Sequence, residues 1–163
     1  MRRFDCLRGI APLLTDELVV SNNGGASTEW AALGRPESHL QVKTLGLCSS
    51  IGLGLALALP RRTVIVLDGD GSLLMNLSTL PTIARQRPPN LVHVVFDNGV
   101  YEASGGTATQ TAPDRAGADL GAMARAAGID AVHAVEAVAD FVERFAAAIK
   151  GGGPTFIHAR VEA

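Results

Sequence analysis

Two uninterrupted apolar segments, residues 63–69 (TVIVLDG) and 91–97 (LVHVVFD), most constrain the fold of this chain. Strands that are covered on both faces read as continuous runs of Val, Ile and Leu, whereas half-exposed strands alternate with polar residues. The segment between them, residues 76–87, has the apolar spacing of a helix. A strand, a helix and a strand in this order predict a parallel pair joined by a crossover.

The rest of the chain continues this alternation of helices and strands. We therefore expect an α/β fold of three layers, in which a parallel sheet has helices on both faces. The 163 residues suit a single domain, residues 1–163, and show no internal repeat or linker. Further helices are expected at residues 4–14, 27–33, 48–59, 119–128 and 137–150, and further strands at residues 17–21, 39–45, 131–135 and 154–161.

The expected helix at residues 48–59 is apolar on nearly every side, which predicts that it is buried. It contains Gly52 and Gly54, which lower helix propensity, so a neighbouring element is expected to pack closely there.

Composition excludes several classes of function. The net charge of -2 provides no cationic surface for nucleic acid or for an acidic membrane, and 4% aromatic residues argue against base stacking. The longest apolar stretch ends at Pro60 and is short for a membrane span. Cys6 and Cys48 form neither a disulfide framework nor a CxxC pair, and the first twenty residues do not resemble a signal peptide. We therefore expect a cytoplasmic protein.

Polar side chains follow the two central strands. GDGS, residues 69–72, comes after the first, and DNGVYE, residues 97–102, comes after the second. Ligands of open α/β sheets bind at the carboxyl ends of strands, where Asp70 and Asn98 would converge. Carboxylate and amide oxygens suit Mg²⁺, which usually shares its coordination with phosphate. A long loop, residues 98–117, follows, and loops of this length are often functional.

The first of these motifs also has the composition of a phosphate site. Gly69 and Gly71 let the backbone approach a phosphate closely. Ser72 and nearby backbone amides can donate hydrogen bonds to it.

The two motifs together resemble the thiamine-diphosphate fingerprint, which begins with GDG and ends in a double Asn. The chain resembles the diphosphate-binding half of sulfopyruvate and phosphonopyruvate decarboxylases, the former through its beta subunit. This likeness runs from about Phe4 to Val161 and is strongest from Leu45 to Gly106. It is carried by the segments VVSNNGGASTEWAALGRPE, LGLCSSIGLGLALAL, LDGDGSLLMNLSTLPTIA and FDNGVYEASGGTATQT.

The resemblance implies a thiamine-diphosphate-binding fold and a set of ligands. Mg²⁺ would be held by the Asp70 carboxylate, the Asn98 amide oxygen and the Val100 carbonyl. Leu45 would prop the cofactor into its bent shape, and Glu102 would lie near the substrate. The other residues that the resemblance places at the cofactor are Asn23, Gly24, Thr44, Gly46, Gly69, Gly71, Ser72 and Tyr101.

The sequence departs from this family at four positions. Asp97 replaces the first Asn of the pair, which is not a ligand, so the metal site is preserved. Lys43 stands where Gly is usual, and Leu47 stands where many relatives have His. Thr28 replaces an Arg, which bears on sulfonate or phosphonate specificity if that Arg contacts the substrate.

The catalytic Glu that activates the cofactor lies in this family on a separate pyrimidine-binding domain, and no Glu here has a matching context. The resemblance thus implies one subunit of a hetero-oligomeric carboxy-lyase, active only with a pyrimidine-binding alpha-type partner. Its expected reaction is decarboxylation of a short 2-oxo acid, similar to sulfopyruvate or phosphonopyruvate.

Three other interpretations stay open. VLDGDGSL fits the haloacid-dehalogenase-like phosphatases, with Asp68 as nucleophile and Asp70 as acid/base. That fold needs a downstream Lys, yet the only later one is Lys150, in a terminal helix. An acetolactate-synthase-like carboligase subunit would use the same cofactor half, and a non-catalytic paralogue would keep the fold without the reaction.

Overall fold

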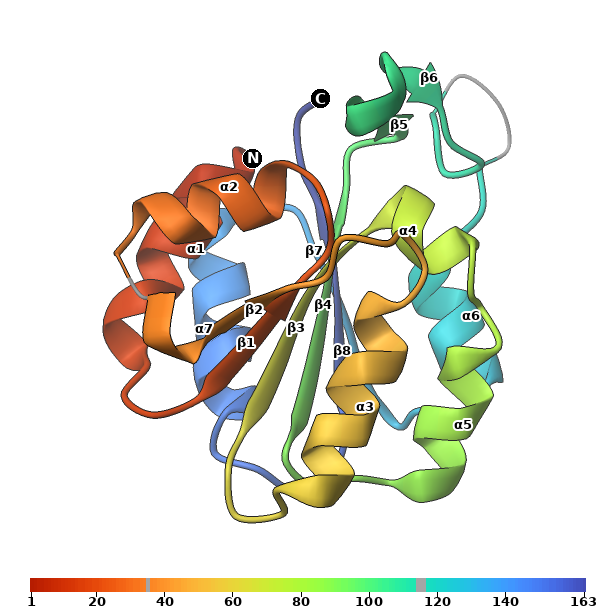
Figure 1. The fold of residues 1–163 in the computed structure, drawn as a ribbon. Coiled ribbons are helices and arrows are strands. Elements are labelled where there is room, and N and C mark those ends of the chain that lie inside the picture. Colours follow the sequence, from red (N-terminus) through yellow and green to blue (C-terminus); the bar gives the residue numbers. More distant parts are fainter. Residues whose placement is uncertain (35, 114–116) are drawn as a thin grey trace.

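The fold is a parallel sheet between two layers of helices. The computed structural model describes residues 1–34, 36–113 and 117–163. Within these ranges, six parallel strands form a sheet in the order β2-β1-β3-β4-β8-β7 (Figure 1). The strands are β1 (Leu18–Ser21), β2 (His39–Gln41), β3 (Val64–Gly69), β4 (Leu91–Asp97), β7 (Ala131–Val135) and β8 (Thr155–Arg160).

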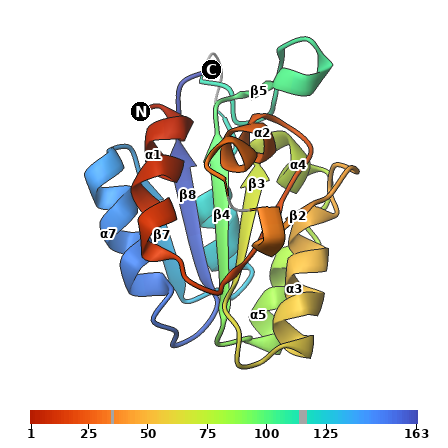
Figure 2. The same cartoon turned by 60° about the vertical axis from the view of Figure 1, so that its left-hand side comes forward.

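Helices cover both faces of this sheet, as the views in Figures 1 and 2 show. One face carries α1 (Arg3–Ile10), α2 (Gly25–Ala32) and α7 (Val138–Ala148). The other carries α3 (Cys48–Ala58), α4 (Asp70–Leu74), α5 (Thr79–Gln86) and α6 (Leu120–Ala126). The predicted three-layer α/β fold is therefore confirmed. In the described part of the chain, every helix is too short or too polar to cross a membrane.

The apolar run of β3 is explained by this double coverage. Successive side chains of a strand point to opposite faces. Ile65 and Leu67 pack with α1, α2 and α7, whereas Val64 and Val66 pack with the helices of the other face. All four are fully buried, so a polar residue at any of them would lack a hydration shell.

The structure corrects several expected boundaries. The helix expected from Ser27 begins at Gly25, and the strand expected to reach Leu45 ends at Gln41. The GDGS motif, residues 69–72, for which no helix was expected, runs into the five-residue helix α4. The long loop contains a small antiparallel hairpin, and its residues 114–116 lie outside the described ranges. The hairpin consists of β5 (Val100–Tyr101) and β6 (Thr107–Ala108), joined through the 3₁₀ turn Glu102–Ser104.

The two helical glycines of α3 differ in their surroundings. A Cβ atom built on Gly52 would lie 2.1 Å from Val66 Cγ2, so α3 packs on β3 with no room for a side chain. Gly54 faces outward, and a Cβ atom there would meet nothing within 4 Å. The prediction of close packing is right at Gly52 and wrong at Gly54, because only one of the two faces the sheet.

Alanine substitutions separate these two glycines. We expect Gly52→Ala to lower the free energy of unfolding by about 1–3 kcal/mol, because the added methyl forces α3 away from Val66. Gly54→Ala is the matched control and should raise it by up to about 1 kcal/mol, through helix propensity alone. Urea titrations followed by circular dichroism measure both, and equal effects of the two substitutions would contradict the packing argument.

Candidate functional site

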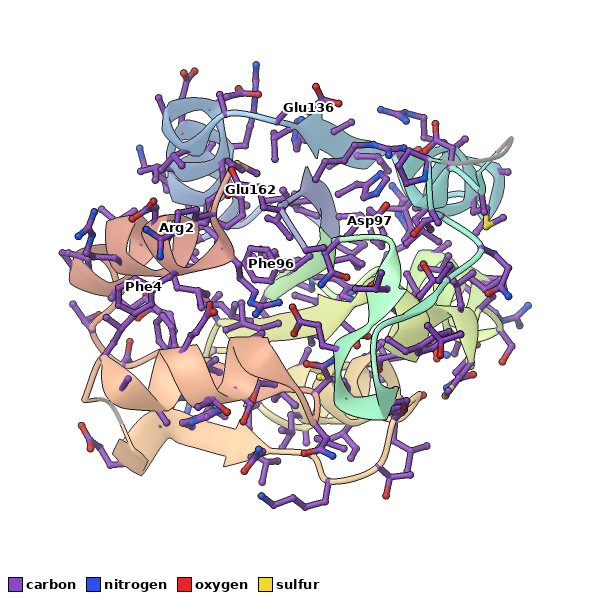
Figure 3. All side chains as sticks on the ribbon, turned by 90° about the horizontal axis from the view of Figure 1, so that it is seen from above. Arg2, Phe4, Phe96, Asp97, Glu136 and Glu162 are labelled. Atoms are coloured by element: carbon purple, nitrogen blue, oxygen red, sulfur yellow. The ribbon has the colours of Figure 1, made fainter. Side chains whose placement is uncertain are left out.

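A cleft opens at the carboxyl edge of the sheet, between the loops that follow β1, β3 and β4. These three strands are neighbours, so their loops meet at one edge. Seen from above, Asp97 lies near the middle of this face, where β4 runs into the hairpin loop, and α1 lies to one side (Figure 3). The cleft is lined by Arg3, Asn22, Asn23, Gly24, Gly25, Ala26, Leu45, Asp68, Gly69, Asp70, Gly71, Ser72, Phe96, Asn98, Val100, Tyr101, Glu102, Ala103 and Ser104.

Most of the residues that the sequence predicts at a cofactor line this cleft. They come from these three loops and, at Leu45, from the loop after β2, although the segments are far apart in the chain. Thr44 and Gly46 are not among its lining residues in the described part of the chain. Gly46 is nevertheless tied to the cleft, because its amide donates to Ser72 Oγ at 3.1 Å.

The turn at Gly46 is fixed to helix α4 by two side chains. Ser72 Oγ accepts from the Gly46 amide, and Asn76 Nδ2 donates to the Gly46 carbonyl at 2.8 Å. Gly46 has a φ of 84°, a left-handed conformation that favours glycine. Because Ser72 acts as an acceptor here, its own hydroxyl proton stays available to a ligand in the cleft.

Asp70 is the buried acid of the site, with 3% of its surface exposed. Its Oδ2 accepts from Thr109 Oγ1 at 2.6 Å and lies 3.1 Å from Thr111 Oγ1. Burial raises the pKa of Asp70 above its ordinary value, and the nearby charge of Asp97 adds to the rise. The threonine hydroxyls oppose this rise, because they stabilise the ionised carboxylate.

Asp97 is a second buried acid close to Asp70, and the Thr111 hydroxyl lies between the two carboxylates. Its Oδ1 accepts from Thr111 Oγ1 at 2.6 Å, and its Oδ2 lies 2.7 Å from His158 Nε2 on β8. Burial alone would raise the pKa of Asp97, but the bonds from His158 and Thr111 outweigh it and bring the pKa below its ordinary value. Asp97 is thus held as a carboxylate inside the protein.

Asn98 is oriented by an ionic cluster at the rim of the cleft. Its Nδ2 donates to Glu102 Oε1 at 2.7 Å, and its Oδ1 accepts from the Val100 amide at 3.1 Å. Glu102 Oε1 also pairs with Arg3 Nη1 at 3.1 Å. Arg3 in turn holds Glu29 of α2 through Nε and Nη2, at 3.0 and 3.1 Å. This cluster ties the hairpin loop to α1 and α2.

Two glycines allow backbone and side chains to approach closely around the cleft. A Cβ atom on Gly71 would lie 2.2 Å from Tyr101 Cε1, so the tyrosine ring packs directly on the α4 backbone. A Cβ atom on Gly25 would lie 2.0 Å from Arg3 Nη2 and 2.8 Å from Glu102 Oε2. A larger residue at Gly71 would push the Tyr101 ring away from α4, and one at Gly25 would displace the ends of the Arg3 and Glu102 side chains.

Asp68 differs from Asp70 in its surroundings, although both line the cleft. Asp68 is 1% exposed, and its Oδ1 accepts from the Gly69 amide at 3.0 Å. Its Oδ2 lies 3.4 Å from Nε2 of the buried His93, without hydrogen-bond geometry. Asp68 is therefore held inward at the end of β3, which does not suit the nucleophile of a phosphatase.

The donor set of the cleft restricts which metal it can hold. In the described ranges, no three His, Cys, Asp or Glu side chains gather as a metal cluster. A metal ion beside Asp70 would therefore depend on amide and carbonyl oxygens, which suit Mg²⁺ better than a transition metal.

Sequence reasoning missed several polar residues of the site, among them four that line the cleft or contact Asp70. Arg3 and Asn22 line the cleft, and Thr109 and Thr111 contact Asp70. Arg3 carries no local signal, because its partners lie on α2 and the hairpin. The threonines had one available signal, since they belong to the long polar loop that follows β4.

The sequence matches a family profile over residues 23–159, described as "Thiamine pyrophosphate enzyme, C-terminal TPP binding domain". This chain belongs to that family. The match spans the loops that line the cleft, from Asn23 through Asp70 and Asn98. It also excludes the phosphatase interpretation of Asp68 and Asp70.

Named relatives of this family extend over nearly the whole chain. Sulfopyruvate decarboxylase subunit beta of Methanothermobacter thermautotrophicus is 38% identical over 163 residues, covering 99% of this chain and 83% of that protein. Phosphonopyruvate decarboxylase of Streptomyces viridochromogenes is 41% identical over 152 residues, covering 93% of this chain. The chain spans only 37% of the length of that second protein.

Solved structures show the same fold for the family. The thiamine diphosphate-dependent 4-hydroxybenzoylformate decarboxylase of Rhodococcus jostii RHA1 matches with a TM-score of 0.83 and 23% identity, covering 99% of this chain and 33% of that one. At this identity the likeness establishes the fold alone.

Removing the Arg3 guanidinium should loosen the hairpin loop. In Arg3→Met, we expect backbone amides of residues 100–108 to exchange with deuterium about tenfold faster, roughly 1.4 kcal/mol, because Glu29 and Glu102 lose their shared partner. Arg8→Met is the matched control, since Arg8 lies on the same helix and, among the described residues, pairs only with Asp5 at the surface. Mass spectrometry of the exchange would contradict this role if the two variants behaved alike.

Proposed function

We propose that this chain is the diphosphate- and Mg²⁺-binding subunit of a thiamine-diphosphate-dependent decarboxylase that acts on a short 2-oxo acid. One observation carries the proposal: the family's diphosphate and metal motifs meet in one cleft, at the carboxyl ends of β1, β3 and β4. The named relatives, sulfopyruvate and phosphonopyruvate decarboxylases, support the reaction class.

The residues of the cleft fit such a cofactor. Asn22 Oδ1 is buried without a hydrogen-bond partner within the described structure, which leaves an acceptor for a donor in the cleft. The backbone at Gly69 and Gly71 lies along the cleft, and a Cβ atom on Gly69 would come within 3.0 Å of Asn22 Nδ2. The site therefore presents open backbone next to an unsatisfied polar atom, as a polar ligand requires.

Each group then has a role. Asp70, the Asn98 amide oxygen and the Val100 carbonyl would hold Mg²⁺. Gly69, Gly71 and Ser72 would hold the diphosphate, with Leu45 under the bend of the cofactor. Asn23, Gly24 and Tyr101 would line it. Thr44 and Gly46 would act through the turn that Ser72 and Asn76 fix.

When bound, thiamine diphosphate supplies a carbon nucleophile and an electron sink, which decarboxylation of a 2-oxo acid needs. This chain would contribute binding and orientation. Its hairpin, held by Arg3 and Glu102, would close one side of the cleft and limit the access of water to the reacting groups.

The activating glutamate is expected on a pyrimidine-binding alpha-type subunit. Glu102 lies at the cleft, but its carboxylate is engaged by Arg3 and Asn98, which suits a substrate-side positioning role better than cofactor activation. Relatives that are named as beta subunits support a hetero-oligomer. The exposed apolar side chains Leu47 and Met75, next to the Gly46 turn, offer contact surface for such a partner.

The substrate is proposed to be similar to sulfopyruvate or phosphonopyruvate. Thr28, where relatives have Arg, is exposed on α2, and Arg3 is the cation that lines the cleft. The free thiols of Cys6 and Cys48, both buried, are consistent with a cytoplasmic location. Acetolactate-synthase-like carboligation remains the alternative reaction, and parallel assays of aldehyde and acyloin products would distinguish it from decarboxylation.

Two neighbouring aspartates test the assignment of the metal ligand: Asp70 in the GDGS motif and Asp68 in the strand before it. Asp70→Ala should abolish Mg²⁺-dependent binding of thiamine diphosphate, because it removes the carboxylate ligand. Asp68→Asn is the matched control and should largely preserve binding, since Asp68 is turned inward toward Gly69 and His93. Isothermal calorimetry on the chain with its partner subunit measures both, and equal losses would refute the assignment.

A non-catalytic paralogue makes a different prediction in the same experiment. It would bind its partner, and even the cofactor, yet release no CO₂ from any 2-oxo acid. Absence of thiamine diphosphate binding by the assembled wild-type protein would overturn the proposed function itself.

A further inference from the structure

A chain of buried hydrogen bonds runs from Asp70 away from the cleft to the strand β8. Asp70 Oδ2 accepts from Thr109 Oγ1 at 2.6 Å, and Thr109 Oγ1 in turn accepts from the Thr111 backbone amide at 3.4 Å. Thr111 Oγ1 donates to Asp97 Oδ1 at 2.6 Å, and Asp97 Oδ2 lies 2.7 Å from His158 Nε2. Four of these side chains, each 5% exposed or less, form what we name the relay: Asp97, Thr109, Thr111 and His158.

The relay resolves an electrostatic conflict. Two carboxylates, Asp70 and Asp97, are buried near one another, and like charges in a low-dielectric interior repel strongly. The Thr111 hydroxyl lies between them, 3.1 Å from Asp70 and 2.6 Å from Asp97. His158 Nε2 contacts Asp97 from the far side, at 2.7 Å from Oδ2. Nonpolar side chains at these positions would avoid the repulsion between the two carboxylates, so we expect the buried carboxylates to have a functional role.

We propose that the relay is a positioning device for Asp70, and this inference rests on the proposed function. Thr109 donates to Oδ2 of Asp70, and the Thr111 hydroxyl, whose proton goes to Asp97, lies 3.1 Å from the same oxygen, which leaves Oδ1 as the oxygen available to a metal ion in the cleft. Hydrogen-bonded partners of ligating carboxylates fix their orientation and commonly set metal affinity. The relay does this for Asp70, as the Glu102–Arg3 pair does for the Asn98 amide.

The relay also accounts for a carboxylate at position 97. Asp97 accepts on both oxygens, from Thr111 on one side and from His158 on the other. An Asn at this position would turn its NH₂ group toward one of these two partners, and that partner would have to become an acceptor. The long loop after β4 has a matching purpose, because it returns Thr109 and Thr111 to the end of β3.

The experiment compares substitutions of Thr111 by a shape-matched and by a hydroxyl-bearing residue. Thr111→Val keeps the shape and removes the hydroxyl, whereas Thr111→Ser keeps the hydroxyl. Mn²⁺ replaces Mg²⁺ as a paramagnetic probe. Its dissociation constant is measured by electron paramagnetic resonance in the presence of thiamine diphosphate. The sample is the full chain assembled with its partner subunit. Thr155→Val, a buried threonine at the opposite end of β8, is the matched control.

We expect Thr111→Val to weaken Mn²⁺ binding by about 10- to 100-fold, and Thr111→Ser to restore it to within a few-fold of the wild type. Thr155→Val should leave the constant unchanged. The melting temperature without metal is recorded for each variant, because a merely structural role would lower that temperature and spare the Mn²⁺ constant. Unchanged affinity in Thr111→Val, or equal losses in the Val and Ser variants, would overturn the relay.

His158 tests how far the relay extends. His158→Gln keeps an N–H donor for Asp97, whereas His158→Phe removes it, so the Phe variant should bind Mn²⁺ at least tenfold more weakly than the Gln variant. Similar constants in the two would end the relay at Asp97 and contradict the proposal. If the wild-type assembly bound no Mn²⁺ in the presence of thiamine diphosphate, the proposed function would be refuted. If the wild-type assembly bound Mn²⁺ and the variants bound it equally well, only the relay would be refuted.

Discussion

The buried carboxylate of Asp70 is the constraint on which the arrangement of this protein depends. A charge that loses its water needs partners, and here they come from distant parts of the chain. Thr109 and Thr111 come from the loop after β4, and Asp97 and His158 come from the ends of β4 and β8. The sheet order places β4 between β3 and β8, so these groups can only meet at the carboxyl edge.

The same edge carries a second, more exposed set of charges. Arg3 gathers Glu29 and Glu102, and through Glu102 it orients Asn98. The cleft thus has a buried wall held by hydroxyls and a rim held by an ion cluster. The rim depends on Gly25, whose missing side chain lets Arg3 and Glu102 approach α2. Strong local packing and charge pairing therefore define the site before any ligand arrives.

The sequence was sufficient for the layers of the fold and for most of the cleft. The strands β3 and β4 were predictable because burial on both faces leaves an unbroken apolar run, and GDG and Asp97–Asn98 follow them directly. Short elements were harder: α4 has five residues, too few for a periodic pattern, so no helix was expected at Asp70. Gly52 and Gly54 look alike in sequence, and only the orientation of α3 on the sheet distinguishes them.

The residues that sequence reasoning missed share a physical cause. Arg3 and Thr111 act through partners far away in the chain, at separations of 99 residues for Arg3–Glu102 and 14 for Thr111–Asp97. Local composition carries no record of such pairs. His158 was readable only as a strand residue, and its partner 61 residues earlier became visible only when β8 was placed beside β4.

The position of β8 has a consequence for how the molecule assembles. Among the described strands this one comes after β7 in sequence, yet it inserts between β4 and β7 and places His158 against Asp97. Pairings of such long sequence separation form late, after the entropy of closing long loops has been overcome. During synthesis, the earlier strands and the GDGS segment would exist first without His158. The buried acids at the carboxyl edge would then gain their full set of partners only once β8 pairs with β4, so the cleft reports on the folding of the whole sheet.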